Sequence, residues 1–246
     1  MGSYGENTLV RGLGFLAEKQ AAIANNLANV DTTSFKRRLA VAQDTPSQFE
    51  SLLGQQMPTI SYTEQSDFGR GVTRETGNLY DVAIDGDSWL RVQNQQGVNF
   101  YSRNGQLQIN SEGRLVNRNG LSVLDQNGQP LQIGSGEDGP SSISISPNGS
   151  VQNPTTGQIF GTLAVVSLPR PDALVPVGKG LYTDPTNQAP TQAGDNLQQG
   201  YLEGSNVDSL QELVQMIAVE RSFSATQKAL SGVSRLQENL ITNILR

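Results

Sequence analysis

The sequence contains neither cysteine nor histidine among its 246 residues. Without cysteine there are no disulfides and no thiolate nucleophile, and without histidine the commonest general acid and base of enzymes is missing. Zinc sites made of cysteine and histidine are excluded for the same reason. An enzyme of this composition would have to rely on carboxylates, or on serine with lysine.

Aromatic residues, long apolar runs and clustered positive charges are also scarce. Only 6% of the residues are aromatic and 35% are hydrophobic, so we expect a modest core and an elongated β-structure with much solvated surface. The 17 basic residues are outnumbered by 23 acidic ones, which argues against nucleic acid as a partner. No apolar run approaches the roughly 18 residues of a transmembrane helix, so we expect no membrane span. Residues 1–7 show no secretory signal, and we expect the chain to stay in the cytoplasm or to leave without a cleavable signal peptide.

An apolar heptad pattern runs through the N-terminal residues. Its members alternate in steps of four and three, which is typical of a helical seam; they are Leu9, Leu13, Leu16, Gln20, Ile23, Leu27 and Val30. The pattern predicts a helix over residues 7–30. Residues 31–34 (Asp-Thr-Thr-Ser) should end it, because their short polar side chains compete for backbone hydrogen bonds.

A second and longer heptad pattern fills the C-terminal region. Its members are Met216, Val219, Phe223, Thr226, Leu230, Val233, Gln237, Leu240 and Ile244. The pattern predicts a helix over residues 208–245, with Ser205 or Asn206 as its cap and with Asp208 and Glu212 adding favourable charge to the first turn.

The middle of the chain has the pattern of a β domain. Turn-forming pairs recur at Asn104-Gly105, Glu112-Gly113, Asn119-Gly120 and Asn127-Gly128, with short apolar stretches between them. This spacing is typical of a meander of short antiparallel strands, and Asn-Gly predicts type I′ turns. The predicted fold class is therefore α+β, with long terminal helices and a central all-β domain.

These patterns divide the chain into five segments. We predict an N-terminal assembly helix with its signature turn in residues 1–36, an extended connector in 37–77, and the β domain in 78–184. A second connector follows in 185–205, and a C-terminal assembly helix occupies 206–246.

The two seams allow two arrangements. They could pair within one chain, but such a hairpin would leave half of each apolar face exposed, and Leu210, Leu213, Val214 and Ile217 widen the C-terminal face further. We therefore expect coiled-coil-like packing between chains. The assembly interface would comprise Leu9, Leu13, Leu16, Ile23, Leu27, Val30, Met216, Val219, Phe223, Leu230, Val233, Leu240 and Ile244.

Candidate catalytic and metal-binding groups do not combine into a known motif. Asp81, Asp85 and Asp87 lack the further ligands of a calcium loop and are interpreted as acids around a hairpin turn. We predict no enzyme activity, with no catalytic residue, metal, cofactor or small-molecule substrate. The alternative from a different class is a secreted carbohydrate-binding or carbohydrate-cleaving β protein, in which Trp89 would stack on a sugar.

Three blocks of sequence resemble one family. Residues 24–30 (Ala-Asn-Asn-Leu-Ala-Asn-Val) and 34–36 (Ser-Phe-Lys) are similar to the N-terminal signature of bacterial flagellar rod and hook proteins. Residues 81–87, 101–105 and 112–116 resemble the opening of that family's β domain, and residues 200–207 resemble its C-terminal signature. The signature residues are Asn25, Asn26, Leu27, Ala28, Asn29, Phe35, Leu202, Glu203, Ser205 and Asn206.

The resemblance implies a structural subunit of the flagellar basal-body rod, the axial drive shaft that crosses the periplasm. Implied partners are further copies of the chain, other rod proteins and the flagellar type III export apparatus. The chain length and the short segment between Phe35 and Gly77 point to a rod subunit, most like the proximal rod protein, with the distal rod protein close behind and a hook-type subunit as a further alternative. We expect Asn25, Asn26 and Asn29 to fix the register between chains. Ser34 departs from the family, which often has glycine before the phenylalanine.

Overall fold

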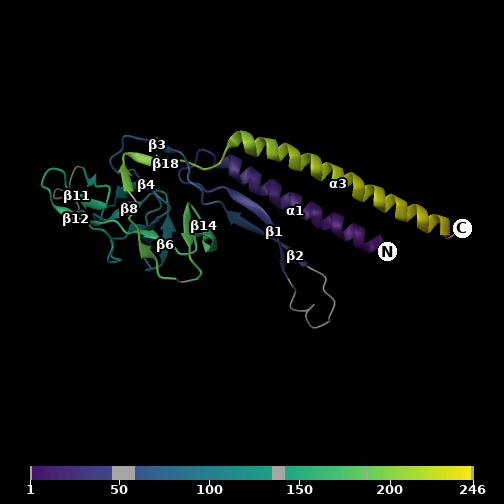
Figure 1. The fold of residues 1–246 in the computed structure, drawn as a ribbon, viewed down its shortest axis with the longest axis horizontal. Helices are drawn as coiled ribbons and strands as arrows, with labels where there is room; N and C mark the ends of the chain where they lie inside the picture. Colours follow the sequence, from purple (N-terminus) through teal and green to yellow (C-terminus); the bar gives the residue numbers. More distant parts are fainter. Residues whose placement is uncertain (1, 46–58, 135–141, 187, 195, 245–246) are drawn as a thin grey trace. The chain divides into compact units, whose positions relative to one another are not determined.

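The structure, a computed structural model, describes residues 2–45, 59–134, 142–186, 188–194 and 196–244. The chain divides into two compact units. Unit 1 comprises Met1–Val30, Arg37–Asp67 and Val207–Arg246, and unit 2 comprises Asp31–Lys36 and Phe68–Asn206. A helix near each end of the chain and antiparallel strands between them confirm the predicted α+β class (Figure 1).

Unit 1 is built on two long helices, α1 (Gly2–Ala28) and α3 (Ser209–Ile244), which lie side by side (Figure 1). Ile23 and Val219, predicted members of the two seams, are buried at 3% and 4% exposure. The other seam residues with described side chains are half-buried: Leu9, Leu13, Leu16, Leu27, Val30, Met216, Phe223, Leu230 and Val233. The side chains of Leu240 and Ile244 lie outside the described part of the chain. The helices thus pair within one chain, and the role of these residues between chains stays a prediction.

Helix α3 has a different cap from the two that we expected. The carboxylate Oδ1 of Asp208 accepts hydrogen bonds from the backbone N–H groups of Leu210, at 2.9 Å, and Gln211, at 3.1 Å. This is the geometry of an N-cap residue, and it also places negative charge at the positive end of the helix. Asn206 instead donates its side-chain amide to the carbonyl oxygen of Gly69 at 3.0 Å.

A hairpin of two eight-residue strands, β1 (Arg38–Thr45) and β2 (Thr59–Ser66), completes unit 1. It falls in the segment expected to be an extended connector, and its strands pair antiparallel along their full described length. The Tyr62 ring lies 5.6 Å from the Phe15 ring, centroid to centroid, and the Tyr62 hydroxyl donates to the carbonyl oxygen of Arg11 at 2.6 Å. The hairpin is therefore attached to α1 by an aromatic contact and a hydrogen bond.

Over its described residues, unit 2 consists of short strands and a short 3₁₀ helix. They are β3 (Thr73–Glu75), β4 (Val82–Asp85), β5 (Trp89–Gln93), β6 (Asn99–Ser102), β7 (Leu107–Ile109), β8 (Leu115–Asn117), β9 (Ser122–Val123), β10 (Ser144–Ile145), β11 (Ser150–Gln152), β12 (Ile159–Thr162), β13 (Val165–Ser167), η2 (Pro171–Ala173), β14 (Val175–Gly178), β15 (Leu181–Thr183), β16 (Thr191–Gln192), β17 (Asn196–Gln199) and β18 (Tyr201–Glu203). The largest sheet has the order β14-β15-β6-β5-β9-β8-β7, with β13 pairing with β5 and β16. The smaller sheets are β10-β11-β12, β17-β4 and β18-β3. Three strands, β16 to β18, lie in the segment expected to be a second connector.

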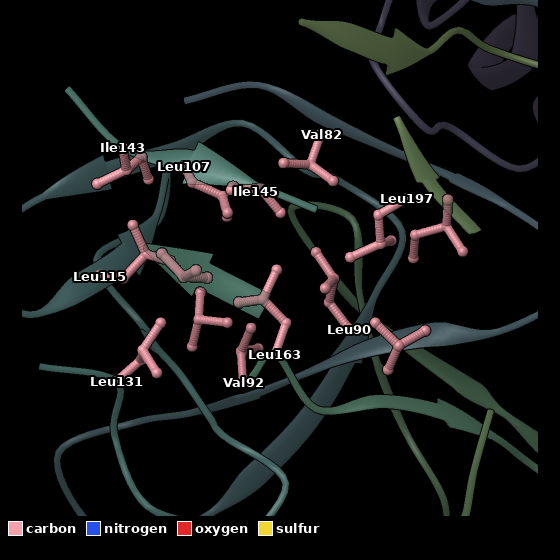
Figure 2. Packing of buried hydrophobic residues seen from close by; sticks show 14 of the residues in the cluster. Val82, Leu90, Val92, Leu107, Leu115, Leu131, Ile143, Ile145, Leu163 and Leu197 are labelled. Atoms are coloured by element: carbon pink, nitrogen blue, oxygen red, sulfur yellow. The ribbon is translucent and has the colours of Figure 1, made fainter. Parts of the chain in front are cut away.

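The core of unit 2 is made of aliphatic side chains from many of these strands (Figure 2). Val82, Leu90, Val92, Leu115 and Leu163 are completely buried within it. A second, aromatic cluster forms around Trp89, whose ring meets those of Phe68 and Tyr182 edge to face at centroid distances of 5.4 and 5.1 Å. Two separate clusters allow a chain with few aromatic residues to bury a β domain of this size.

The four turns of unit 2 that were predicted to be type I′ are not of that type. That type needs a positive φ at both central residues, and among the described non-glycine residues only Ser34 and Lys179 have one. Instead, one module recurs in which an Asn or Asp at position i accepts, through Oδ1, from the N–H groups of residues i+2 and i+4, with a positive-φ glycine at i+3. It is seen at residues 94–98, 110–114, 117–121 and 125–129. Three of the four predicted turn pairs, at 112–113, 119–120 and 127–128, lie in such turns, whereas Asn104-Gly105 does not. In each of the three, the side chain that accepts these hydrogen bonds lies two residues before the pair.

Candidate functional site

The signature residues surround two buried carboxylates, one in each unit. Glu212 of α3 is 1% exposed in unit 1, and Glu203 of β18 is 3% exposed in unit 2. A buried carboxylate is stable only with charged or hydrogen-bonding partners. In each unit, at least one of those partners comes from the N-terminal signature or from the residue that follows it directly.

In unit 1, Glu212 binds groups from α1 and from the start of β1. Its Oε1 accepts a hydrogen bond from Nε of Arg37, and its Oε2 accepts from the side-chain amide of Asn26 at 3.3 Å. Asn26 is itself 1% exposed, and the Arg37 side chain 18%. The cluster therefore joins the end of α1, the start of the hairpin and the first turn of α3 within unit 1.

Asn26 also pairs with the backbone of the hairpin. Its Oδ1 accepts from the N–H of Arg38 at 2.8 Å, and its Nδ2 donates to the carbonyl oxygen of Arg38 at 2.9 Å. The side-chain amide thus occupies the place of a neighbouring peptide group at the first residue of β1. These described partners all lie in unit 1, and the expected role of Asn26 in fixing the register between chains stays a prediction.

The other two asparagines of the N-terminal signature, Asn25 and Asn29, contact each other. Asn29 donates its side-chain amide to the carbonyl oxygen of Asn25 at 2.8 Å, one helical turn back. This bond satisfies a carbonyl at the end of α1 that has no partner within the helix. Leu27 is half-buried and Ala28 is exposed.

In unit 2, Glu203 lies between two cations. Its Oε2 accepts from Nε of Arg103 at 2.7 Å, and its Oε1 accepts from Nζ of Lys36 at 2.7 Å. The Lys36 side chain is 0% exposed and that of Arg103 3%. The backbone N–H of Gly71 donates to the same Oε1 at 3.0 Å. Both carboxylate oxygens are thereby satisfied inside the protein.

These contacts decide the ionisation of Glu203. Burial alone would raise the pKa of its carboxyl group, but the charges of Arg103 and Lys36, and the hydrogen bonds from Lys36 and Gly71, act in the opposite direction and lower the pKa below its usual value. Glu203 is therefore a carboxylate at neutral pH, and the three side chains carry one net positive charge.

Ser34 and Phe35 of the N-terminal signature hydrogen-bond to residues in and next to β18, the strand that carries Glu203. The Ser34 N–H donates to the carbonyl oxygen of Glu203 at 2.9 Å, and its hydroxyl donates to the carbonyl oxygen of Arg103 at 2.8 Å. Ser34 has φ = 55°, in the left-handed region that favours glycine. This explains why glycine suits the position before Phe35, and the hydroxyl contacts show what the serine adds.

Sequence reasoning identified Glu203 and Asn26 only as members of signatures, and it assigned no role to Lys36 or Arg103. Glu212 was interpreted as a helix-end charge. The sequence did contain one usable signal. Glu203 lies between Leu202 and Gly204 in the C-terminal signature, a setting that favours a buried strand. A carboxylate buried there would need a cation as its partner. Leu202 beside it is 3% exposed, while Ser205 and Asn206 are half-buried.

The other candidates have structural explanations. Asp85 and Asp87 are exposed and both pair with Arg70, at 3.2 and 3.1 Å. Asp81 is buried and accepts from the side-chain amide of Asn78 at 3.1 Å. In the part of the chain that the structure describes, no group of three potential metal ligands gathers. Trp89 is 1% exposed, so its faces are covered by protein and cannot stack on a sugar.

Unit 1 also presents an exposed apolar stripe, here called the α3 stripe. It consists of Leu210, Leu213, Val214 and Ile217, which are between 50% and 70% exposed. Their spacing of three, four and seven residues puts them on one face of the helix. Neither α1 nor α3, over its described residues, is both long and apolar enough to cross a membrane.

A second exposed face runs along α1 and is here called the α1 small face. Its members follow one another in steps of four and three and are all exposed: Val10, Gly14, Ala17, Ala21, Ala24 and Ala28. Small residues at this spacing let another helix approach closely.

Comparison with known proteins matches all three parts of the chain. The family models described as "Flagella basal body rod protein", "Flagellar hook protein FlgE/F/G D1 domain" and "Flagellar basal body rod FlgEFG protein C-terminal" match residues 7–36, 83–153 and 198–243. The two terminal matches include all the signature residues.

Curated relatives align over almost the whole chain. The flagellar basal-body rod protein FlgG of Borreliella burgdorferi is 32% identical over 85% of this chain and 86% of its own length. FlgG of Bacillus subtilis is 29% identical over 94% and 96%, and the rod protein FlgF of Caulobacter vibrioides is 29% identical over 90% and 90%. The chain belongs to the family of flagellar basal-body rod and hook proteins.

Proposed function

We propose that the protein is a structural subunit of the bacterial flagellar basal-body rod and that it polymerises through α1 and α3. The observation that supports assembly through the helices is the α3 stripe. α1 and α3 already pair with one another, yet four large apolar side chains at the start of α3 stay at least half exposed. Contiguous apolar surface of this kind marks an interaction site.

The two exposed faces of unit 1 are complementary in size. Large side chains of the α3 stripe fit against the shallow surface that glycine and alanine create on the α1 small face, as knobs fit holes. The stripe of one copy would therefore bind the small face of the next. Contacts between two different faces do not close after two copies and can continue into a helical filament.

In this proposal, the seam residues and the exposed faces have different roles. The seam residues, such as Ile23 and Val219, hold the two helices of one subunit together, and the exposed faces contact neighbouring subunits. Unit 2 contributes a β domain held by its own core.

The remaining expectations follow from the family and are part of the proposal. The subunit acts as a structural protein rather than an enzyme, lies in the periplasmic rod of the basal body, and binds copies of itself and other rod proteins. It reaches that place through the flagellar export apparatus without a cleavable signal peptide. The sequence favours the proximal rod protein, with the distal rod protein close behind.

The test is incorporation into basal bodies in cells that lack their own copy of the subunit. Leu213→Lys with Val214→Lys places two charges in the α3 stripe. Gln211→Lys with Ser222→Lys adds two lysines at exposed positions outside the stripe and serves as the matched control. We expect the stripe variant to be made and folded but absent from purified basal bodies, and the control to be incorporated. Equal incorporation of both variants would remove the α3 stripe from the assembly interface.

A further inference from the structure

Residues Asp31–Lys36 belong to unit 2, although the residues on both sides of them belong to unit 1. This short segment, here called the latch segment, is held mainly by polar contacts. Lys36 binds the Glu203 carboxylate and the carbonyl oxygen of Gly69, each at 2.7 Å, and Ser34 binds the carbonyl oxygens of Arg103 and Glu203. Neither apolar cluster of unit 2 takes a described residue from the segment.

The site that receives the latch segment is built by the rest of unit 2. Arg103 pairs with Glu203 and also donates to the carbonyl oxygens of Ser88, at 2.7 Å, and Gly86, at 2.8 Å. The Gly71 N–H fixes the other carboxylate oxygen. Glu203 is thus oriented by groups outside the segment, and Lys36 adds a second cation to a carboxylate that already has one.

We propose that residues Asp31–Lys36 act as a releasable latch, a lysine-bearing peptide ligand that the chain supplies to a preformed site on its own β unit. The proposal goes beyond assembly through the helices, because it concerns the segment that follows α1 and the strand that precedes α3. The latch segment connects the two leads, meaning the residues that follow α1 and the residues that precede α3. The Ser34 N–H donates to the Glu203 carbonyl oxygen, and the Asn206 N–H donates to the Phe35 carbonyl oxygen at 3.3 Å.

The charges in the site make loss of Lys36 tolerable for the β unit but make loss of the Glu203 charge costly. If Lys36 leaves, Glu203 keeps Arg103 as its partner, so the β unit retains a neutral buried pair. If Glu203 is neutralised, two buried cations lose their shared counter-charge, which is much more costly. The β core should therefore survive loss of the lysine and should be strained by loss of the glutamate.

The test uses the full chain and hydrogen exchange of single backbone amides. Lys36→Met empties the site while keeping side-chain length, and Lys228→Met at an exposed position of α3 is the control. We expect Lys36→Met to speed exchange of the Ser34 and Asn206 amides by about tenfold to a hundredfold, the range that follows from losing one charge-assisted hydrogen bond. The amides of Val92 and Leu115 in the core should exchange as in the unaltered chain.

Each other outcome overturns the proposal in a distinct way. If the core amides also exchange faster, the segment is an integral part of the fold and not a releasable ligand. If Ser34 responds and Asn206 does not, the two leads are not coupled. If neither responds, Lys36 does not hold the segment. Glu203→Gln supplies the internal comparison, because it should speed exchange in the core as well.

Discussion

The side-chain amide of Asn26 and the peptide groups of Arg38 hydrogen-bond in both directions. The Arg38 N–H donates to Oδ1 at 2.8 Å, and Nδ2 donates to the Arg38 carbonyl oxygen at 2.9 Å. Nδ2 also reaches Glu212. An asparagine of the N-terminal signature therefore completes the edge of the hairpin and partners a buried carboxylate at the same time.

Asn26→Ala should destabilise unit 1. It leaves the peptide groups of Arg38 and one oxygen of Glu212 without their amide partner, and unmade buried hydrogen bonds typically cost about 1–3 kcal/mol. Urea unfolding followed by helical circular dichroism measures the change. Asn29→Ala is the control, since Asn29 makes its bond at a less buried helix end, and it should cost less than about 1 kcal/mol. Equal losses for both variants would contradict the assigned role of Asn26.

The stability of unit 2 should fall at acid pH because of Glu203. The folded protein lowers the pKa of this carboxyl group, so the stabilisation is fully present above its ordinary pKa and is lost as the pH falls through the lowered value. Trp89 is the only tryptophan and lies buried in unit 2, so its fluorescence follows unfolding there. Glu203→Gln should be less stable at neutral pH and should show a shallower pH dependence. A pH dependence identical to that of the unaltered chain would mean that other carboxylates cause it.

Substitutions of Ser34 should separate backbone strain from hydrogen bonding. Glycine relieves the left-handed backbone, worth about 1–2 kcal/mol, but removes the hydroxyl bond to Arg103, worth about 1 kcal/mol. Ser34→Gly should therefore change the unfolding free energy by no more than about 1 kcal/mol. Ser34→Val neither relieves the left-handed backbone nor keeps the hydroxyl hydrogen bond. It should therefore lower the unfolding free energy by at least about 2 kcal/mol. A stable valine variant would show that the segment can adopt another backbone conformation.

The seam and the α3 stripe should respond differently to truncation in the isolated subunit. Ile23→Ala removes a side chain that is 3% exposed and should lower the stability of unit 1 by about 2–4 kcal/mol. Leu213→Ala, at 50% exposure, should change it by less than about 0.5 kcal/mol. Circular dichroism during urea unfolding measures both. A large loss for Leu213→Ala would show that the stripe is covered within the monomer.

The elements that the sequence predicted well are those with a local period. The seams around Ile23 and Val219 repeat every three or four residues, and this spacing determines which side of a helix is buried. The hairpin of β1 and β2 was missed although Ile60 and Tyr62 have strong strand preference. Its pairing could not be found from the sequence, because residues 46–58 between the strands are a much longer connection than the loops of two to five residues that signal a hairpin.

The partners of the two buried carboxylates could not be predicted for a different reason. Lys36 and Glu203 are 167 residues apart, and nothing in the local pattern of either residue indicates its partner. A fragment cut at the predicted boundaries, residues 36 and 205, would lose Lys36 and the Asn206 amide, and with them part of the site around Glu203.

The same separation has a consequence for the order in which the chain becomes complete. A protein made from its N-terminus, or passed end first through a narrow channel, delivers residues 31–36 long before β18. Contacts of such high sequence separation form late and slow folding. Lys36 therefore stays without its carboxylate partner, Glu203, until more than four-fifths of the chain has emerged.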